Sequence, residues 1–135
     1  MALEGEFLLL GRIVLGSLFL YNGYNHFADF EGRKGYAEYK GAPAPGFSVI
    51  ASGVVLVGGA IGIMAGILPV ISAGALTVFL LVATPMFHDF WTVSDEERQN
   101  EFNHFFKNVG LLGGTLVLLS TASEPWAYAA GVGLF

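Results

Sequence analysis

The sequence predicts an all-α membrane protein, a transmembrane four-helix bundle with up-down-up-down topology over a single domain, residues 1–135. Hydrophobic residues make up 54% of the chain and charged residues only 13%, whereas a soluble domain carries about 25% charged residues. The interval between Lys40 and Asp89 contains no charge, and it is long enough for two spans of about 20 residues each. Every span has to be helical, because lipid offers no hydrogen-bond partners to open strand edges.

Four apolar segments account for these helices. The first, about residues 7–27, follows an acidic N-terminus rather than the basic one of a signal peptide, so we expect a retained span. The second, about 47–68, and the third, about 70–91, are joined by a very short turn at Pro69. The fourth runs from about 103 to 122. Four spans with such connections predict a bundle of antiparallel neighbours.

Two polar connections lie at one end of the predicted bundle. Residues 28–46 hold six charges and two prolines and are expected to form a loop. Residues 92–102 form the second connection, in which Ser94 followed by Glu97 is typical of a capping box that starts a helical lead into the fourth span.

Arg12 and the C-terminal tail lie toward the other end. We expect Arg12 to reach the outer interface by snorkelling, or to pair with an acidic side chain, Glu4, Glu6 or Glu124. The tail, residues 123–135, is apolar but too short to cross a bilayer. Its aromatic residues, Trp126 and Tyr128, are expected at the level of the lipid headgroups.

The distribution of basic residues predicts the orientation. The two polar connections carry Arg33, Lys34, Lys40 and Arg98, whereas the termini and the Pro69 turn carry no Lys or Arg outside the spans. The positive-inside rule therefore places both polar connections in the cytoplasm and both termini outside. We expect a multi-pass protein of the cell membrane.

Several function classes are excluded or disfavoured by composition. The net charge of -5 provides no basic surface for nucleic acid. The absence of cysteine excludes a disulfide scaffold, a cysteine-based zinc or iron–sulfur site, and a CxxC redox relay within the chain. Any redox role would therefore depend on a partner, such as a soluble redox protein.

Polar residues gather where the first span ends, the third span ends and the fourth begins, and an antiparallel bundle brings these three ends to one level. All three histidines of the chain lie there. Ionisable groups at membrane depth are costly and normally face the bundle interior or a polar cavity. The candidate ligand-binding residues are Asn22, His26, His88, Asp89, Asn103, His104, Lys107 and Asn108. We expect Asp89 to lie beside Lys107, and we assign no catalytic residue.

Three interpretations of this cluster compete. Aromatic residues surround it and, with a few converging donors, favour a pocket for a flat amphipathic molecule such as a quinone. The same aromatics would equally form an interfacial belt, with the histidines bonded to headgroups or neighbours. A metal site would need His26, His88, Asp89 and His104 at about 2 Å from one ion, and their wide separation along the chain disfavours it.

Glycines repeat every four residues on two predicted helices. Gly58, Gly62 and Gly66 form one strip, and Gly110 and Gly114 form another. Small residues let membrane helices approach closely. We expect these strips to pack helices within the bundle, or alternatively to form the interface of a homo-oligomer.

Three segments resemble the DoxX family of small four-span membrane proteins, and the order and spacing agree along nearly the whole chain. They are Gly11 to Gly16 with Asn22, Gly23 and His26; Ala83 to Trp91; and Asn103 to Asn108 with Gly110, Gly113 and Gly114. The resemblance implies a four-helix bundle in a prokaryotic cytoplasmic membrane. It also implies a link to redox biology, since relatives include the membrane subunit of thiosulfate:quinone oxidoreductase and partners of oxidative-stress enzymes. Distant eukaryotic relatives act as cargo receptors or assembly chaperones, and no catalytic residue transfers.

Two functions therefore remain open from the sequence. The first is a membrane redox component, such as a subunit of a quinone-linked oxidoreductase, that binds a quinone or similar lipid-soluble molecule and works with a soluble partner. The second is a non-enzymatic membrane module that binds lipid or a client protein and stabilises a complex.

Overall fold

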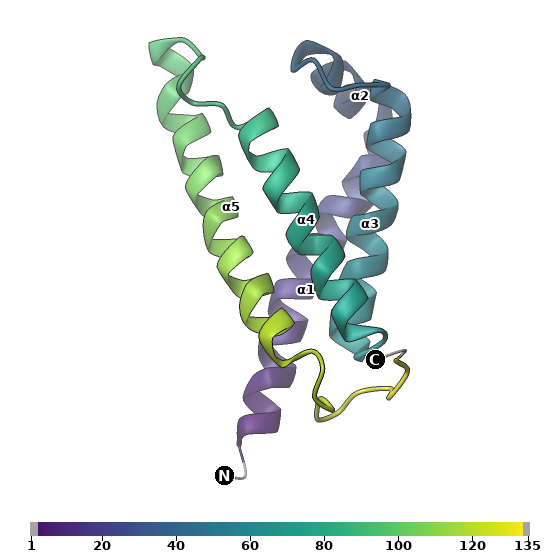
Figure 1. Ribbon diagram of the computed structural model, residues 1–135. Helices are drawn as coiled ribbons and strands as arrows, with labels where there is room; N and C mark the ends of the chain where they lie inside the picture. Colours follow the sequence, from purple (N-terminus) through teal and green to yellow (C-terminus); the bar gives the residue numbers. More distant parts are fainter. Residues whose placement is uncertain (1–2, 134–135) are drawn as a thin grey trace.

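The computed structural model describes residues 3–133, and helices dominate them (Figure 1). In chain order they are α1 Glu4–Ala28, α2 Phe30–Tyr39, α3 Pro45–Ala65, α4 Pro69–Phe87 and α5 Asp95–Thr121. The four long helices, α1, α3, α4 and α5, run alternately up and down, and α2 lies across one end of α3 (Figure 1). The expected all-helical membrane bundle is confirmed.

Three of these helices, α1, α3 and α4, are long and apolar enough to cross a membrane. Helix α5 is longer, at 27 residues, but its first turn holds three acidic residues and its middle carries the polar stretch from His104 to Asn108. In the described part of the chain, α5 does not qualify as a membrane span by hydropathy alone. The crossing by the fourth segment therefore stays a prediction.

The bundle consists of two helix pairs. Helix α1 packs along α3, helix α5 packs along α4, and α3 meets α4. The two pairs are close at the α3–α4 turn and separate toward α2 (Figure 1). The tightly packed core lies at the closed end, where Leu56, Ile63 and Leu76 are fully buried. The separation at the other end leaves space between the pairs.

Glycine allows the close approach at that closed end, but only at some of the expected positions. A Cβ on Gly62 would overlap the Ser72 hydroxyl of α4, and one on Gly16 would overlap Met64. A Cβ on Gly58 or Gly110 would meet nothing within 4 Å. The expected strips thus divide into packed and open glycines.

Helix α2 occupies most of the region expected to be a loop, so that expectation is wrong for residues 30–39. Its apolar face explains the difference: Ala37 is buried with Val49 of α3, and Phe30 and Met86 pack against them. Tertiary burial thus supports a ten-residue helix that is too short to be stable alone.

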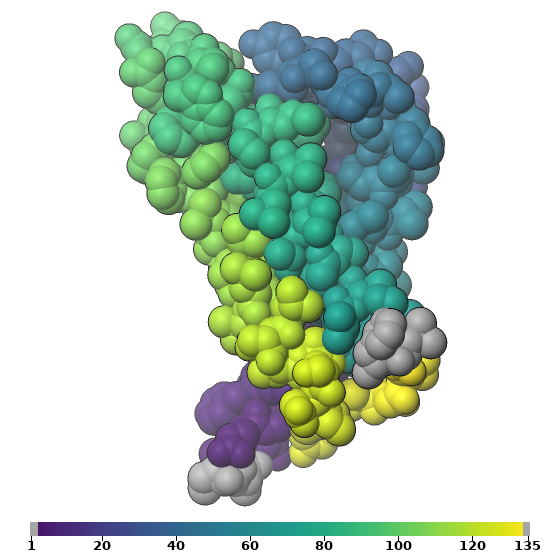
Figure 2. Space-filling view, in the orientation of Figure 1, coloured from purple at the N-terminus to yellow at the C-terminus, as the bar shows by residue number. Residues whose placement is uncertain are grey.

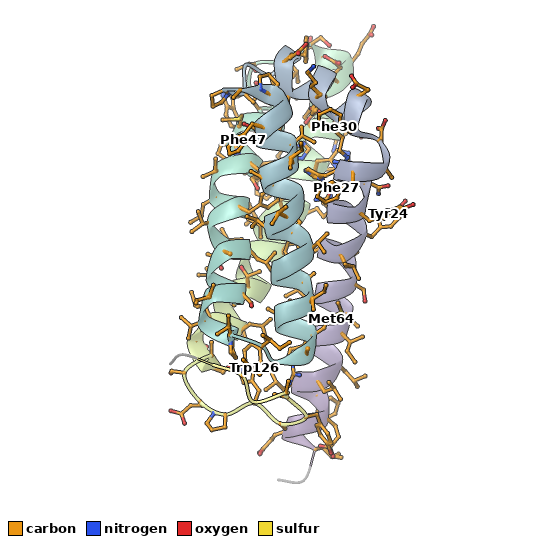
Figure 3. All side chains as sticks on the ribbon, turned by 90° about the vertical axis from the view of Figure 1, so that its right-hand side faces the viewer. Tyr24, Phe27, Phe30, Phe47, Met64 and Trp126 are labelled. Carbon is orange, nitrogen blue, oxygen red and sulfur yellow. The ribbon has the colours of Figure 1, made fainter. Side chains whose placement is uncertain are left out.

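The C-terminal tail folds back under the closed end of the bundle. Trp126 is only 7% exposed and donates from Nε1 to the Thr121 carbonyl oxygen at 3.1 Å, so its ring packs against the chain (Figure 3). That the tail lies at the level of the lipid headgroups stays a prediction. The tail then runs beside the α3–α4 turn, where the Ala130 amide donates to the Ala65 carbonyl oxygen at 2.7 Å. Tyr128 is exposed, and its hydroxyl donates to Glu6 at 3.0 Å.

Arg12 explains why the tail takes this path. Its side chain is fully buried, so the expected snorkelling is wrong. The guanidinium donates to four backbone carbonyl oxygens, those of Ile63, Met64, Ala127 and Tyr128, at 2.6–3.0 Å. The first two belong to the last turn of α3, where unpaired carbonyls and the helix dipole favour a cation. Arg12 therefore ties α1, α3 and the tail together.

Candidate functional site

The space between the two helix pairs is a cavity of about 980 Å³ at the α2 end of the bundle. Figure 2 shows the surface hollowed between α3 and α4 at this end. Most of the wall is apolar, with aromatic rings from Phe19, Phe47, Phe79 and Phe87. The mouth includes Val78 and Val82, which are 60% and 55% exposed and lie on a helix apolar enough to span a membrane. Apolar side chains of α4 thus border the cavity on its exposed side.

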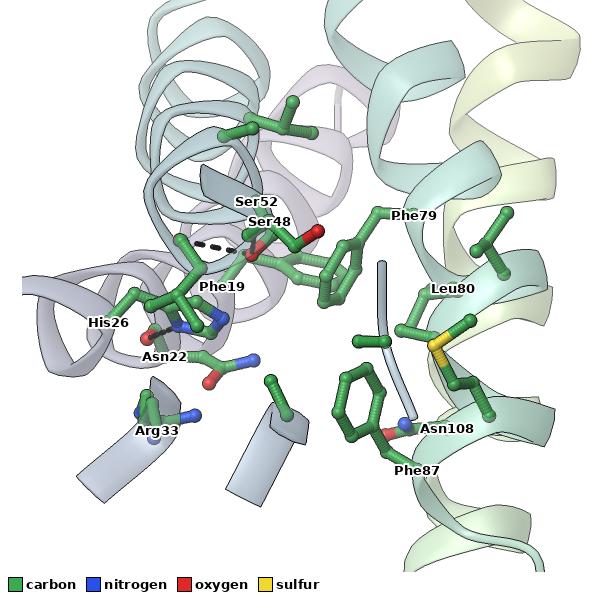
Figure 4. Close-up of a pocket in the computed structure, with 18 of the residues that line it drawn as sticks. Phe19, Asn22, His26, Arg33, Ser48, Ser52, Phe79, Leu80, Phe87 and Asn108 are labelled. Carbon is green, nitrogen blue, oxygen red and sulfur yellow. Dashed lines mark hydrogen bonds between the residues drawn. The ribbon is translucent and has the colours of Figure 1, made fainter. Parts of the chain in front are cut away.

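Polar side chains gather on the α1 and α3 side of the cavity. His26 is 8% exposed, and its Nδ1 lies 2.8 Å from the Asn22 carbonyl oxygen. Because that oxygen can only accept, Nδ1 carries the proton and Nε2 of the neutral ring keeps its lone pair. The Asn22 amide points into the cavity near His26 (Figure 4). The hydroxyls of Ser48 and Ser52 also line the cavity but donate to backbone carbonyls.

His88 and His104 form the other polar wall. His88 Nδ1 lies 2.8 Å from Glu101 Oε2, and the two imidazoles stack with centroids 5.1 Å apart. His88 follows the last residue of α4 and so lies outside that apolar segment. Burial lowers its pKa below the ordinary 6.5, although the hydrogen bond to Glu101 raises it in part. The neutral ring donates to Glu101, which leaves Nε2 as an acceptor.

Six of the eight predicted site residues line the cavity: Asn22, His26, His88, His104, Lys107 and Asn108. The other two do not. Asn103 is exposed and accepts a hydrogen bond from Gln99 on its own helix. Asp89 lies 2.5 Å from Lys40 Nζ rather than beside Lys107, so the expected pair is wrong. The reason is helix α2, which carries Lys40 to the end of α4.

Helix α2 is fastened to α4 across the cavity at two points. The first is the Lys40–Asp89 ion pair. The second is the Tyr36 hydroxyl, which donates at 2.9 Å to the Phe87 carbonyl oxygen, one of the unpaired carbonyls at the end of α4. Lys40 also lies over the rings of Tyr36 and Tyr39, 5.7 Å from each centroid. The α2 segment therefore covers the polar end of the cavity.

Sequence reasoning missed Glu101, Arg33 and Tyr36. Glu101 precedes His104 by three residues, so the two share a helix face, and this spacing was a usable signal. No comparable spacing marked Arg33 and Tyr36, because the sequence predicts a loop for their segment and a loop has no periodic face. Within residues 3–133, no three His, Asp or Glu side chains are grouped so that they could hold a metal ion.

The comparison with known families decides what kind of protein this is. The family model for DoxX matches residues 7–89, from the start of α1 to the loop after α4. The chain belongs to the DoxX family. The chain is also similar to inner membrane protein YphA of Escherichia coli (strain K12), at 28% identity over 114 residues that cover 84% of this chain and 81% of that protein. No solved structure matches the chain. Together with its apolar helices, this makes it an integral membrane protein.

Proposed function

We propose that this DoxX-family protein binds a quinone, or a similar lipid-soluble molecule with a flat polar head, in the cavity between its helix pairs. The observation that carries the proposal is the shape of that cavity: about 980 Å³, with aromatic and aliphatic walls and a cluster of polar groups at one end. Small-molecule sites have this character, mostly apolar with a few placed donors and acceptors.

In this arrangement the apolar tail lies between α3 and α4, near Val78 and Val82, and the ring lies among the aromatic side chains. The Asn22 amide donates to a ring carbonyl. His26 and His88 each keep a free Nε2 that accepts a hydrogen bond from a quinol hydroxyl. A histidine so placed also accepts the proton that the quinol releases when it is oxidised.

The proposal extends to topology and partners. The helices α1, α3, α4 and α5 each cross the membrane, with α2 and the α4–α5 loop in the cytoplasm and both termini outside, as the basic residues predict. Because the chain has no cysteine to carry electrons, a soluble redox protein at the cytoplasmic face supplies or removes them.

Native mass spectrometry of protein purified in a mild detergent tests ligand binding. A quinone should be retained by the wild type and lost from His26→Leu and His88→Leu, which remove the two free acceptors. Asp95→Asn is the matched control, since Asp95 is exposed on the first turn of α5. Retention of phospholipid alone, with added quinone failing to displace it, would contradict the quinone and favour a lipid-binding module instead.

A further inference from the structure

The cavity lining has an unbalanced charge. Two of the lining residues, Arg33 and Lys107, are cationic, and none of the described lining residues is Asp or Glu. Two acidic groups at this end of the bundle are engaged elsewhere: Glu101 with His88, and Asp89 with Lys40. Ionised groups that line a space next to lipid are costly unless something pairs with them.

Of these two cationic residues, Arg33 gives the stronger evidence for a missing acceptor. Its Nε is buried and has no hydrogen-bond partner among the described residues. Three other cations of the chain have acceptors: Arg12 has four carbonyls, Lys40 has Asp89 and Arg98 has Asp95. A buried donor of a charged group that stays unpaired costs more than a neutral one. The unpartnered Nε of Arg33 at the cavity wall therefore favours an acceptor that arrives with the ligand.

The neighbours of Arg33 favour the same chemistry. His26 and Asn22 line the same part of the cavity as Arg33, and the Asn22 amide adds a donor there (Figure 4). The Ser48 and Ser52 hydroxyls already donate hydrogen bonds to backbone carbonyl oxygens. The groups on this wall that can still donate thus include Arg33, Asn22 and Asn25.

We infer that the cavity selects an amphiphile whose head carries a negatively charged oxygen, bound by Arg33 with Asn22. The inference rests on the proposal that the cavity takes a lipid-soluble ligand, and it names the charge of that ligand. The anionic oxygen belongs to an ionised quinol or hydroxyquinone, or to the carboxylate or phosphate of a lipid. A charge-assisted hydrogen bond to guanidinium is about twice as strong as a neutral one.

Two matched quinones test this in nanodiscs of phosphatidylcholine. A 2-hydroxy-3-alkyl-1,4-naphthoquinone is anionic at neutral pH, and its 2-methoxy ether is neutral. Arg33→Gln should weaken binding of the anionic probe by about tenfold or more, the scale of one charge-assisted bond, and leave the neutral probe unchanged. Arg33→Lys should restore part of the loss. The variants are compared with one probe at a time, because the partitioning of that probe into lipid is then the same for every variant and does not affect the comparison.

The control is Lys34→Gln, which removes the neighbouring charge on α2 from a residue that does not line the cavity. It should leave both probes unchanged. An equal loss of both probes in Arg33→Gln, or no loss of either, would overturn the inference while leaving quinone binding intact.

Palmitate and methyl palmitate separate a lipid carboxylate from a quinone. Binding of palmitate that depends on Arg33, with neither quinone bound, would sustain the anionic head and overturn the quinone proposal. Failure of all four probes would overturn both.

Discussion

The Arg12 guanidinium lies over the indole of Trp126, 5.1 Å from the ring centroid, and both side chains are buried at the closed end of the bundle. This contact joins the first helix to the C-terminal tail. A cation above an aromatic face gains about 2 kcal/mol when both are desolvated. The contact holds the tail under α3 at the closed end of the bundle, opposite the α2 end that contains the cavity.

Arg12→Met should destabilise the protein strongly. It leaves four carbonyl oxygens without their donor, and each buried acceptor left unpaired costs about 1–3 kcal/mol. We expect a loss of at least about 3 kcal/mol, measured as a fall in the melting temperature in detergent. Arg98→Met, which removes only an exposed ion pair, should change stability by less than about 0.5 kcal/mol. Equal melting of the two variants would mean that Arg12 does not hold the tail.

Gly62→Ala and Gly58→Ala form a matched pair on α3. The new methyl group at position 62 would overlap Ser72 on α4, which we expect to cost about 1–3 kcal/mol through overpacking. At position 58 the methyl group meets nothing within 4 Å, and alanine should gain about 0.5–1 kcal/mol of helix preference. Thermal melts of both variants in one detergent provide the measurement. The reverse order would show that Gly58, not Gly62, is the packed glycine.

The Lys40–Asp89 pair should release α2 at low pH. The hydrogen bonds from Lys40 and then from Thr92 hold the pKa of Asp89 below its ordinary 3.8. The pair therefore holds α2 against the end of α4 above pH 3.8, and this contact is lost as the pH falls through the lowered pKa. Burial alone would lower the Lys40 pKa, but the bond to Asp89 raises it above 10.5, so Lys40 stays charged through neutral pH.

Spin labels on cysteines at Glu38 and Val93 measure this directly, since the chain has no cysteine of its own. The distance distribution should be narrow at pH 7 and should broaden only as the pH falls below 3.8, through the lowered pKa of Asp89. Lys40→Met should broaden it already at pH 7, with Lys34→Met as the control. A narrow distribution in Lys40→Met would show that Tyr36 alone is sufficient to hold α2.

His88 should be neutral at pH 7 and titrate below 6.5, because burial lowers its pKa. This neutral ring supports folding at neutral pH, and the support is lost as the pH falls through the lowered pKa. Glu101→Gln removes the group that raises the pKa and should lower it further. Imidazole ¹⁵N shifts of the three histidines follow the titration, with Glu97→Gln expected to have no effect. An unchanged His88 titration in Glu101→Gln would separate the two residues in solution.

Single cysteines test the orientation. Gly35→Cys should be protected from an impermeant reagent in intact cells and react only after lysis, whereas Ser123→Cys should react from outside. Both positions are exposed on the protein surface, so protection reports the membrane side. Reaction of position 35 in intact cells would invert the topology.

Sequence alone predicted the four long helices and the level at which their polar residues meet. Apolar runs and prolines bounded α3 and α4 to within a few residues, because membrane length and the missing proline amide act locally. The third span ends earlier than expected, at Phe87, two residues after Pro85. The position of His26, His88 and His104 at one level followed from the alternation of helix direction.

Only the tertiary structure decided which of these side chains meet. Lys40 reaches Asp89 because α2 is a helix, and α2 is a helix because Ala37 is buried against α3. Arg12 is buried because the tail returns to supply two of its four carbonyl acceptors. Both outcomes depend on contacts between segments distant in the chain, and local periodicity carries no information about such contacts. The unpartnered Nε of Arg33 at the cavity wall has the same origin, because it lies on α2, a helix that forms through tertiary packing.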